Sequence, residues 1–517
     1  MKVTLVYPDI RTRLRLRTKG YFYSGLACIS AALKEAGHSV SLLHYLSAPS
    51  RDEFCADLEA QAPDLLAFSS TTNLFGYVRQ WASWARQTVP DLTTLCGGVH
   101  VTLNPQESLA TTELDAICRG EGEEAVAEFC QRLAEGKDAG DVANVWSRGR
   151  DGEIRRTPQR PLVADLSKLP LPDRGLFEPA RLNTPSKLVV MASRGCPYSC
   201  TYCCNRALRD LSGPGHYVRF RAPDHVMREI QLARALLPDV DGVIFDDDIF
   251  GLRMDWLRDF IPAYTRGVAL PFKCNMRPNL VTPELVALLA QGGCVEVAMG
   301  VESGNGRIRN EVLGRRLSAE QISRAFRLFA EAGIRTCSYN MVGLPHENMR
   351  NCLETVKFNA ALKPDWRMSE LNVSIFYPYV GTPLFDECAK HGWLTDRDTP
   401  DYADDTILSH DQLSRSQIRF MAYYFRPLTG LYAKLGRCRW PPARRLEAAL
   451  DRVLCSQAAQ LALLPAANAF FSRAVGAARR LRLWSRVALP ERALAGARPA
   501  ASTVGALAQQ AEESHAH

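Results

Sequence analysis

The sequence of 517 residues predicts an α/β protein: a Rossmann- or flavodoxin-like parallel sheet, then a partial (β/α)6 barrel, then a helical region. Three observations carry this prediction. Strand-like and helix-like segments alternate over residues 1–135, the alternation restarts at residue 188, and apolar spacing becomes helical from residue 411. Such alternation implies parallel sheets covered by helices on both faces. The expected parts are a domain at 1–135, a linker at 136–187, a barrel at 188–385, a helical region at 386–500 and a disordered tail at 501–517.

The first part contains short apolar segments that predict parallel strands at 3–7, 40–44, 64–70 and 93–98. Residues 116–124 predict a short further strand, a tight loop and the start of a helix. Residues 25–37 predict a helix that ends at a glycine. Ligands of open parallel sheets lie beyond the carboxyl ends of the strands. The candidate ligand residues at these ends are Ser69, Ser70, Thr71, Gly97, Gly98, Val99, Gly120, Glu121 and Gly122.

The second part has six apolar segments that predict the strands of an open barrel, at 188–193, 242–250, 272–277, 295–303, 336–343 and 371–377. A Pro-rich segment at 166–174 precedes them and is typical of a linker. Barrel enzymes place their chemistry at the carboxyl ends of the strands. Besides a cysteine loop, these ends carry Asp247, Glu302, Ser303 and Gly343.

The cysteine loop reads Arg-Gly-Cys-Pro-Tyr-Ser-Cys-Thr-Tyr-Cys over residues 194–203, which sets Cys196, Cys200 and Cys203 at C-x3-C-x2-C spacing. Three thiolates can hold three irons of a [4Fe–4S] cube and leave the fourth iron open to another ligand. One alternative is a structural zinc site, but such sites usually have four ligands in paired knuckles. Ordinary core thiols are the other alternative.

With Tyr202 before its last cysteine, this loop resembles the signature of the radical S-adenosylmethionine (SAM) superfamily. The resemblance implies a [4Fe–4S] cluster on the three cysteines, with SAM bound to the unique iron. One electron from the cluster then cleaves SAM to methionine and a 5′-deoxyadenosyl radical. The implied SAM contacts are Tyr202, Asp247, Glu302, Ser303 and Gly343. The chain departs from the family's fifth-strand pattern at Tyr339 and Glu347, which leaves the contacts from that strand open.

The part that precedes this motif resembles the cobalamin-binding domain of the B12-dependent radical SAM enzymes. The shared features are Gly25-Leu26 and Gly37-His38 around the first helix, a Gly-Gly-x-His loop at 97–100 and a Gly-Glu-Gly-Glu turn at 120–123. The resemblance implies that the nine strand-end residues named above bind cobalamin. The sequence has no Asp-x-His-x-x-Gly motif, so we expect base-off cobalamin without histidine on cobalt. His100 is the alternative axial ligand.

Composition places the chain among globular proteins, with 46% hydrophobic and 23% charged residues. Sixteen scattered cysteines and the lack of a signal peptide favour a reducing cytoplasm. Of the net charge of +7, residues 411–517 contribute 16 Lys and Arg against 6 Asp and Glu. Their arginines alternate with Phe470, Phe471, Leu481, Leu483 and Trp484, so these helices could touch an anionic membrane surface or a lipophilic substrate. A solvated face that caps the barrel is the alternative, and no nucleic-acid motif is present.

The leading hypothesis for function is a B12-dependent radical SAM enzyme that methylates an unactivated carbon of a biosynthetic intermediate. A radical oxidative cyclase or ring-rearranging enzyme is the second hypothesis. A non-catalytic cobalamin or iron–sulfur sensor is the third, and the SAM-binding strand ends argue against it. The expected partners are a small-molecule or lipid-like substrate and a flavodoxin- or ferredoxin-type electron donor. The sequence leaves the identity of the substrate open.

Overall fold

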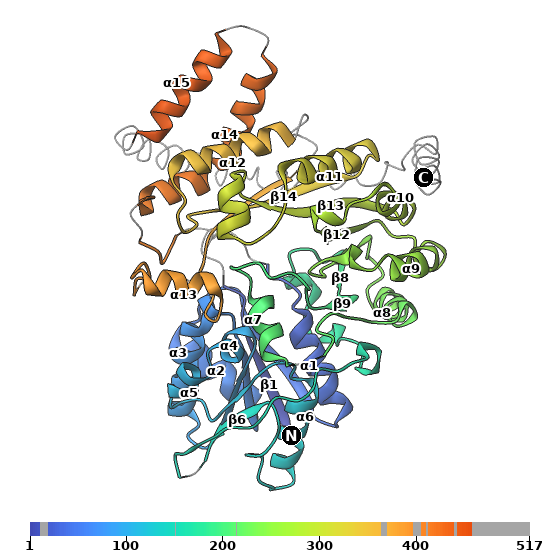
Figure 1. Ribbon diagram of the computed structural model, residues 1–517. Helices are drawn as coiled ribbons and strands as arrows, with labels where there is room; N and C mark the ends of the chain where they lie inside the picture. Colours follow the sequence, from blue (N-terminus) through green and yellow to red (C-terminus); the bar gives the residue numbers. More distant parts are fainter. Residues whose placement is uncertain are drawn as a thin grey trace, which may run out of the picture. The chain divides into compact units, whose positions relative to one another are not determined.

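The computed structural model describes residues 1–10, 19–149, 151–213, 215–362, 370–396, 405–409, 412–438 and 442–456. The chain forms two compact units. The first consists of Met1–Asn275, Leu313–Arg315 and Tyr377–Ile407. The second consists of Met276–Val312, Arg316–Phe376 and the described residues from Leu408 on. Figure 1 shows the elements of both units along the chain.

The first unit opens with a seven-stranded sheet of order β2-β1-β3-β4-β5-β6-β7. Strands β1 to β5 run parallel, and β6 and β7 are antiparallel. The bounds are β1 Lys2–Pro8, β2 Ser39–Tyr45, β3 Leu65–Ser69, β4 Thr93–Gly97, β5 Ala116–Cys118, β6 Val145–Arg148 and β7 Ile154–Arg155. The predicted parallel strands are present, whereas β6 and β7 fall in the segment that the sequence predicted to be a linker.

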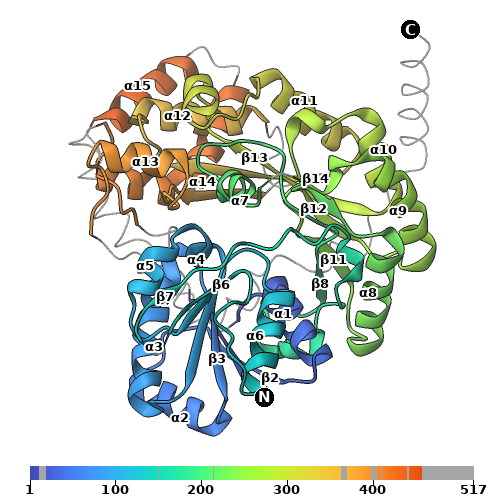
Figure 2. The same cartoon turned by 60° about the horizontal axis from the view of Figure 1, so that its bottom comes forward.

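Helices cover both faces of this sheet (Figure 2). Helices α2 (Arg51–Gln61) and α3 (Phe75–Thr88) pack on one face through Phe54, Trp81 and neighbouring apolar side chains. Helices α1 (Ser24–Glu35) and α6 (Glu123–Ala134) pack on the other through Leu33 and Phe129. Two short helices, α4 (Val99–Leu103) and α5 (Pro105–Ala110), follow β4. Because both faces are covered, the carboxyl ends of β3, β4 and β5 are left as the ligand edge.

The second sheet has six strands in the order β15-β14-β13-β12-β11-β8, and the described pairs are parallel. The bounds are β8 Lys187–Val190, β11 Gly242–Phe245, β12 Phe272–Met276, β13 Cys294–Glu302, β14 Arg335–Val342 and β15 Glu370–Ile375. The helices between them are α8 Pro223–Leu236, α9 Met254–Gly267, α10 Pro283–Gln291, α11 Ala319–Glu331 and α12 Met349–Leu362. The predicted α/β class and the six strands of the open barrel are therefore confirmed.

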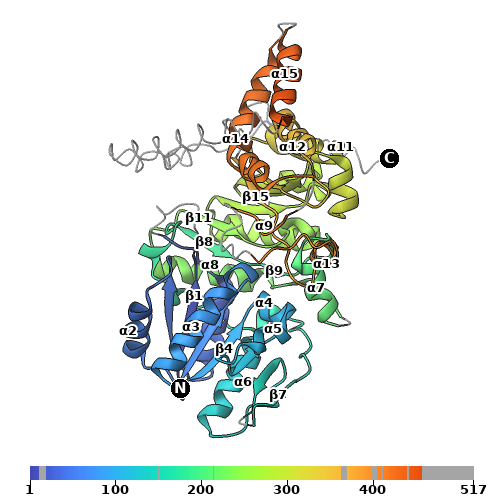
Figure 3. The ribbon, with the colours of Figure 1, turned by 90° about the vertical axis from the view of Figure 1, so that its left-hand side faces the viewer.

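Three helices follow the last strand. Helix α13 (Pro383–Lys390) belongs to the first unit and lies across the predicted boundary at residue 385 between the barrel and the helical region. In the second unit, α14 (Arg415–Arg437) packs beside α12 in a shared apolar core, and α15 (Ala443–Cys455) follows it (Figure 3). Both lie where the sequence predicted helical spacing from residue 411. The rest of the predicted helical region, the disordered tail predicted at 501–517 and the apolar residues from Phe470 to Trp484 lie outside the described residues.

Within the described part of the chain, no helix combines the length and the apolar character that crossing a membrane requires.

Candidate active site

Two glycine loops lie at the ligand edge of the first sheet. Gly98 follows β4 with φ +104°, and a Cβ atom there would come within 2.5 Å of the carbonyl oxygen of Ser70. Only glycine fits this turn without a clash. At Gly97, by contrast, an added Cβ atom would meet no described atom within 4 Å. Gly97 therefore presents bare backbone to open space, as a close approach to a large ligand requires.

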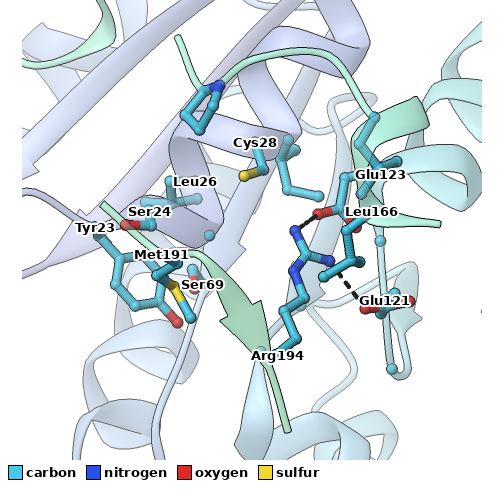
Figure 4. Close-up of a pocket in the computed structure, with 18 of the residues that line it drawn as sticks. Tyr23, Ser24, Leu26, Cys28, Ser69, Glu121, Glu123, Leu166, Met191 and Arg194 are labelled. Atoms are coloured by element: carbon cyan, nitrogen blue, oxygen red, sulfur yellow. Dashed lines mark hydrogen bonds and ion pairs between the residues drawn. The ribbon is translucent and has the colours of Figure 1, made fainter. Parts of the chain in front are cut away.

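A cavity of about 530 Å³ lies against this edge (Figure 4), within the size range of cofactor sites. It brings together seven of the nine residues predicted to bind cobalamin, namely Ser69, Gly97, Gly98, Val99, Gly120, Glu121 and Gly122. The other two, Ser70 and Thr71, are described but lie outside the lining, and their hydroxyls donate to Thr71 O (2.8 Å) and Asn73 Oδ1 (2.8 Å).

Other walls of the cavity come from segments that do not follow the strands of the first sheet, so the sequence did not predict them. Helix α1 contributes Tyr23 at its start and Cys28, and the segment before β8 contributes Leu166 and Pro170. Arg194, which leads into the cysteine loop, lines it too. The walls thus combine bare glycine backbone, apolar side chains and a few charged groups. A mostly apolar lining with a few polar groups is typical of a cofactor site.

The cysteine loop begins where the short strand β9 (Ser193–Arg194) ends. Gly195 has φ +88°, and an added Cβ atom would come within 2.5 Å of Tyr217 O, so the tight entry to the loop requires glycine. The backbone of Thr201 is held on both sides: its N–H donates to Leu313 O (3.2 Å), and its carbonyl accepts from Leu384 N (3.1 Å). Tyr202 Oη accepts from Arg315 (2.7 Å). The loop is therefore fixed by the fold of its own unit.

The three candidate cluster ligands lie on this loop, Cys200 buried and Cys196 and Cys203 half-buried. A hydrogen bond from the Cys204 thiol lowers the pKa of Cys203, and burial raises the pKa of Cys196 to about 11. Cys204 starts helix α7 (Cys204–Leu211). Among the described residues, no three His, Cys, Asp or Glu side chains converge closely enough to hold one metal ion. Three thiols on one loop nonetheless match the donor set of a [4Fe–4S] cube, in which each thiolate binds a different iron.

Three aspartates follow β11 and have different surroundings. Asp247 is fully buried, its carboxylate accepts from Ala192 N (3.2 Å) and from the Ser193 hydroxyl, and burial raises its pKa to about 6. Its side chain therefore fixes the turn between β8 and β9. The carboxylates that reach the surface are Asp246, which lines the cavity, and Asp248, which accepts from Asn205 (3.0 Å).

The other predicted SAM contacts lie in the second unit, whereas Tyr202 and Asp247 lie in the first. Glu302 ends β13 at a β-bulge with φ +61°, a left-handed conformation that is rare for a residue with a side chain. Ser303 is buried, and its carbonyl accepts from Arg309 (2.9 Å).

Gly343 directly follows β14 and has φ +77°, and its N–H donates to Glu347 (2.8 Å). Glu347 is fully buried, which raises the pKa of its carboxyl to about 7. The Glu347 carboxylate thus caps the backbone at the end of β14, although the spacing between Gly343 and Glu347 departs from the family pattern.

Comparison with known proteins identifies two family domains in order: the B12 binding domain over residues 21–130 and the radical SAM superfamily over residues 190–358. An uncharacterised methyltransferase of Pyrococcus horikoshii is 24% identical over 83% of this chain and 93% of its own length. The anaerobic magnesium-protoporphyrin IX monomethyl ester cyclase of Rubrivivax gelatinosus is 25% identical over 73% of this chain and 68% of its own length.

Among solved structures, the cobalamin-dependent SAM radical enzyme OxsB with aqua-cobalamin and SAM matches with a TM-score of 0.62 at 14% identity. The match covers 89% of this chain and 74% of that one, and it shows a shared fold. The two family domains, their order and this fold agree with the site described above. The chain therefore belongs to the cobalamin-dependent radical SAM enzymes, whose cofactors are a [4Fe–4S] cluster, SAM and cobalamin.

Proposed function

We propose that this enzyme is a methyltransferase that acts on an unactivated carbon of a small-molecule intermediate. The observation that carries the proposal is the cavity, because it places the candidate cobalamin residues and the stem of the cysteine loop around one space. When bound, cobalamin would supply a methyl group, and SAM at the cluster would supply the hydrogen-abstracting radical. The residues of the chain would orient these groups and keep water away from them.

The proposed cluster ligands are Cys196, Cys200 and Cys203, on the loop that Thr201 anchors. Anaerobic reconstitution should then give about four irons per chain. Replacing any of the three ligands by alanine should abolish the cleavage of SAM, whereas Cys204→Ala, the matched control one residue further, should not. Full cleavage by all three ligand variants would contradict the assignment.

The proposed cobalamin site uses the glycine loops and no histidine on cobalt. His100 is buried, its ring stacks on Phe75 at 4.1 Å between centroids, and it is not among the described residues that line the cavity. Burial lowers its pKa to about 4, so the ring is neutral at physiological pH. These contacts support a role for His100 in the core of the domain.

The proposed SAM contacts are the backbone near Tyr202, the strand ends at Glu302 and Ser303, and the backbone at Gly343. The left-handed backbone of Glu302 supports its assignment, because strained residues persist where a function needs them. Asp247 would act indirectly, since its buried carboxylate fixes the β8–β9 turn that leads to the cysteine loop.

The test of methyl transfer is the stoichiometry of SAM. Each turnover should consume two SAM and release one S-adenosylhomocysteine and one 5′-deoxyadenosine, with electrons from a flavodoxin- or ferredoxin-type donor. With methyl-deuterated SAM, the product should gain three deuterons. The similarity to the cyclase of Rubrivivax gelatinosus favours oxidative cyclisation as the second candidate. Conversion with 5′-deoxyadenosine but without S-adenosylhomocysteine or label would replace the first candidate by the second.

A lipid-like substrate or a peripheral membrane contact through the C-terminal region is a further part of this proposal. It rests on the excess of positive charge in residues 411–517. Flotation with anionic and with neutral vesicles tests it, and equal recovery with both would argue against an electrostatic membrane contact.

A further inference from the structure

One carboxylate at the edge of the cavity is held by two arginines. Glu121 lies in the glycine turn between β5 and α6, and its Oε1 accepts from Arg194 Nη1 (2.9 Å) and from Arg219 Nη2 (2.9 Å). Its Oε2 accepts from Arg219 Nη1 (2.8 Å). The pair with Arg219 is therefore bidentate, the strongest geometry for a carboxylate and a guanidinium. Figure 4 shows Arg194 reaching Glu121 across the cavity wall.

The two arginines come from a small antiparallel ribbon that carries the cysteine loop. In its register, Arg194 of β9 faces Arg219 of β10 (Arg219–Phe220). Facing residues of a ribbon project to the same side, so both guanidinium groups reach the same carboxylate. Arg194 also donates to Glu123, the first residue of α6 (2.6 Å). The ribbon is thus tied to the glycine turn through both of its strands, two residues before Cys196.

A third segment joins at the same carboxylate. Val163, in the connection between the first sheet and β8, donates its N–H to Glu121 Oε2 (3.2 Å), and its carbonyl accepts from Arg219 (2.9 Å). The side chains of Glu121 and Arg219 are only 18% and 6% exposed. Burial raises the pKa of Glu121, but its bonds to Arg219 and Arg194 outweigh this and leave the pKa below the usual range. The carboxylate is therefore ionised, and both of its oxygens accept hydrogen bonds.

We propose that Glu121 is a positioning residue that sets the distance and orientation between bound cobalamin and the [4Fe–4S] cluster. The proposal rests on the proposed function for the presence of both cofactors. Glu121 lines the cavity, and through Arg194 and Arg219 it holds the ribbon from which the cysteine loop starts. Reactions between groups on two cofactors lose about 100-fold in rate when the groups are misplaced by about 1 Å. A rigid link through Glu121 would keep the distance and orientation between the two cofactors constant.

The helix that follows the glycine turn offers a matched control. Glu128, on α6, is bonded to Arg132 and to Arg160 of the connecting segment, so it too is a carboxylate between two arginines. Glu128 is absent from the described lining of the cavity, and its arginines do not lead to the cysteine loop. Loss of Glu128 removes a comparable ion pair without freeing the ribbon. A general effect on stability would appear in both variants, and an effect on position only in Glu121→Gln.

The experiment measures the dipolar coupling between Co(II) cobalamin and the reduced cluster by pulsed electron paramagnetic resonance on the full chain with both cofactors. Wild type and Glu128→Gln should give one narrow distribution of distances. Glu121→Gln, at unchanged cobalamin and iron content, should give a distribution about twofold broader or displaced by about 1 Å or more. If Glu121→Gln loses its cofactors, Arg219→Lys, which keeps the charge but not the bidentate fork, should show the same broadening.

A distribution in Glu121→Gln or Arg219→Lys that is as narrow as in wild type and centred at the same distance would overturn the positioning role. Equal broadening in Glu128→Gln would overturn it as well, because the effect would then be general. If wild type itself retains no cobalamin, the proposed function fails, and that outcome is distinct from the first two. The measurement needs no substrate, so failure of methyl transfer leaves its result unaffected.

Discussion

Replacing Asp247 by asparagine is expected to remove a pH dependence from the stability of the protein. The carboxylate is fully buried, and burial raises its pKa to about 6 against an ordinary value of about 3.9. A group whose pKa is raised by folding stabilises the fold while protonated, and this contribution is lost as the pH rises through the folded pKa. A shift of about two units corresponds to about 3 kcal/mol in the free energy of unfolding.

About 1.4 kcal/mol of this change falls between pH 5 and pH 8, where the protein can be handled. Denaturant unfolding of the cofactor-free full chain, followed by tryptophan fluorescence at several pH values, gives the free energy of unfolding for both proteins. The difference between wild type and Asp247→Asn should change by about 1.4 kcal/mol over this range, whatever the pH-independent cost of the substitution. Ser193→Ala removes a donor to the carboxylate and should move the transition to higher pH. Parallel curves for wild type and Asp247→Asn would refute the reasoning, because the carboxylate would then have to reach water or a cation.

Three further substitutions, one of them with a matched control, test the geometry of the site. Gly98→Ala places a Cβ atom 2.5 Å from a backbone oxygen at φ +104°, so it should destabilise the protein by about 1–3 kcal/mol and release cobalamin. The matched control Gly97→Ala should fold normally, and equal stability of the two variants in thermal unfolding would contradict this expectation. Asn205→Ala removes a hydrogen bond to the Cys203 sulfur (3.8 Å) and should lower the reduction potential of the cluster in an EPR-monitored titration; an unchanged or higher potential would speak against that bond. His100→Ala should leave the spectrum of Co(II) cobalamin unchanged, and loss of a nitrogen splitting in this variant would identify His100 as an axial ligand.

The parts of the site that a local pattern encodes could be predicted from the sequence. The three cysteines lie within eight residues, and the glycine turns follow directly on apolar strands, so spacing alone located them. Seven of the nine strand-end residues line one cavity for the same reason, since parallel strands end at one edge. Ser70 and Thr71 fall outside because the chain turns away immediately after β3, into a 3-10 helix that begins at Thr72.

The parts that depend on contacts between distant segments could not be predicted. Arg219 is 98 residues from Glu121, and only the fold brings their side chains together. The sequence held one weak indication of this contact. Arg219 and Arg221 alternate with an aromatic residue, and charged residues alternate in this way when one face of a strand meets a partner. The sequence predicted that Asp247 contacts SAM. A run of three aspartates does not reveal which of the three side chains is buried in the protein.

The two antiparallel strands that close the first sheet have a practical consequence for dividing this protein. Strand β6 pairs with β5 along Ala116–Cys118, so a fragment that ends at residue 135 would expose the backbone edge of β5. Exposed edges pair with other chains, and such a fragment would tend to aggregate. A fragment that includes β7 would cover the edge but would leave Glu121 without Arg194 and Arg219. Chimeras that exchange cobalamin modules between relatives should therefore carry the glycine turn and both arginines from the same parent.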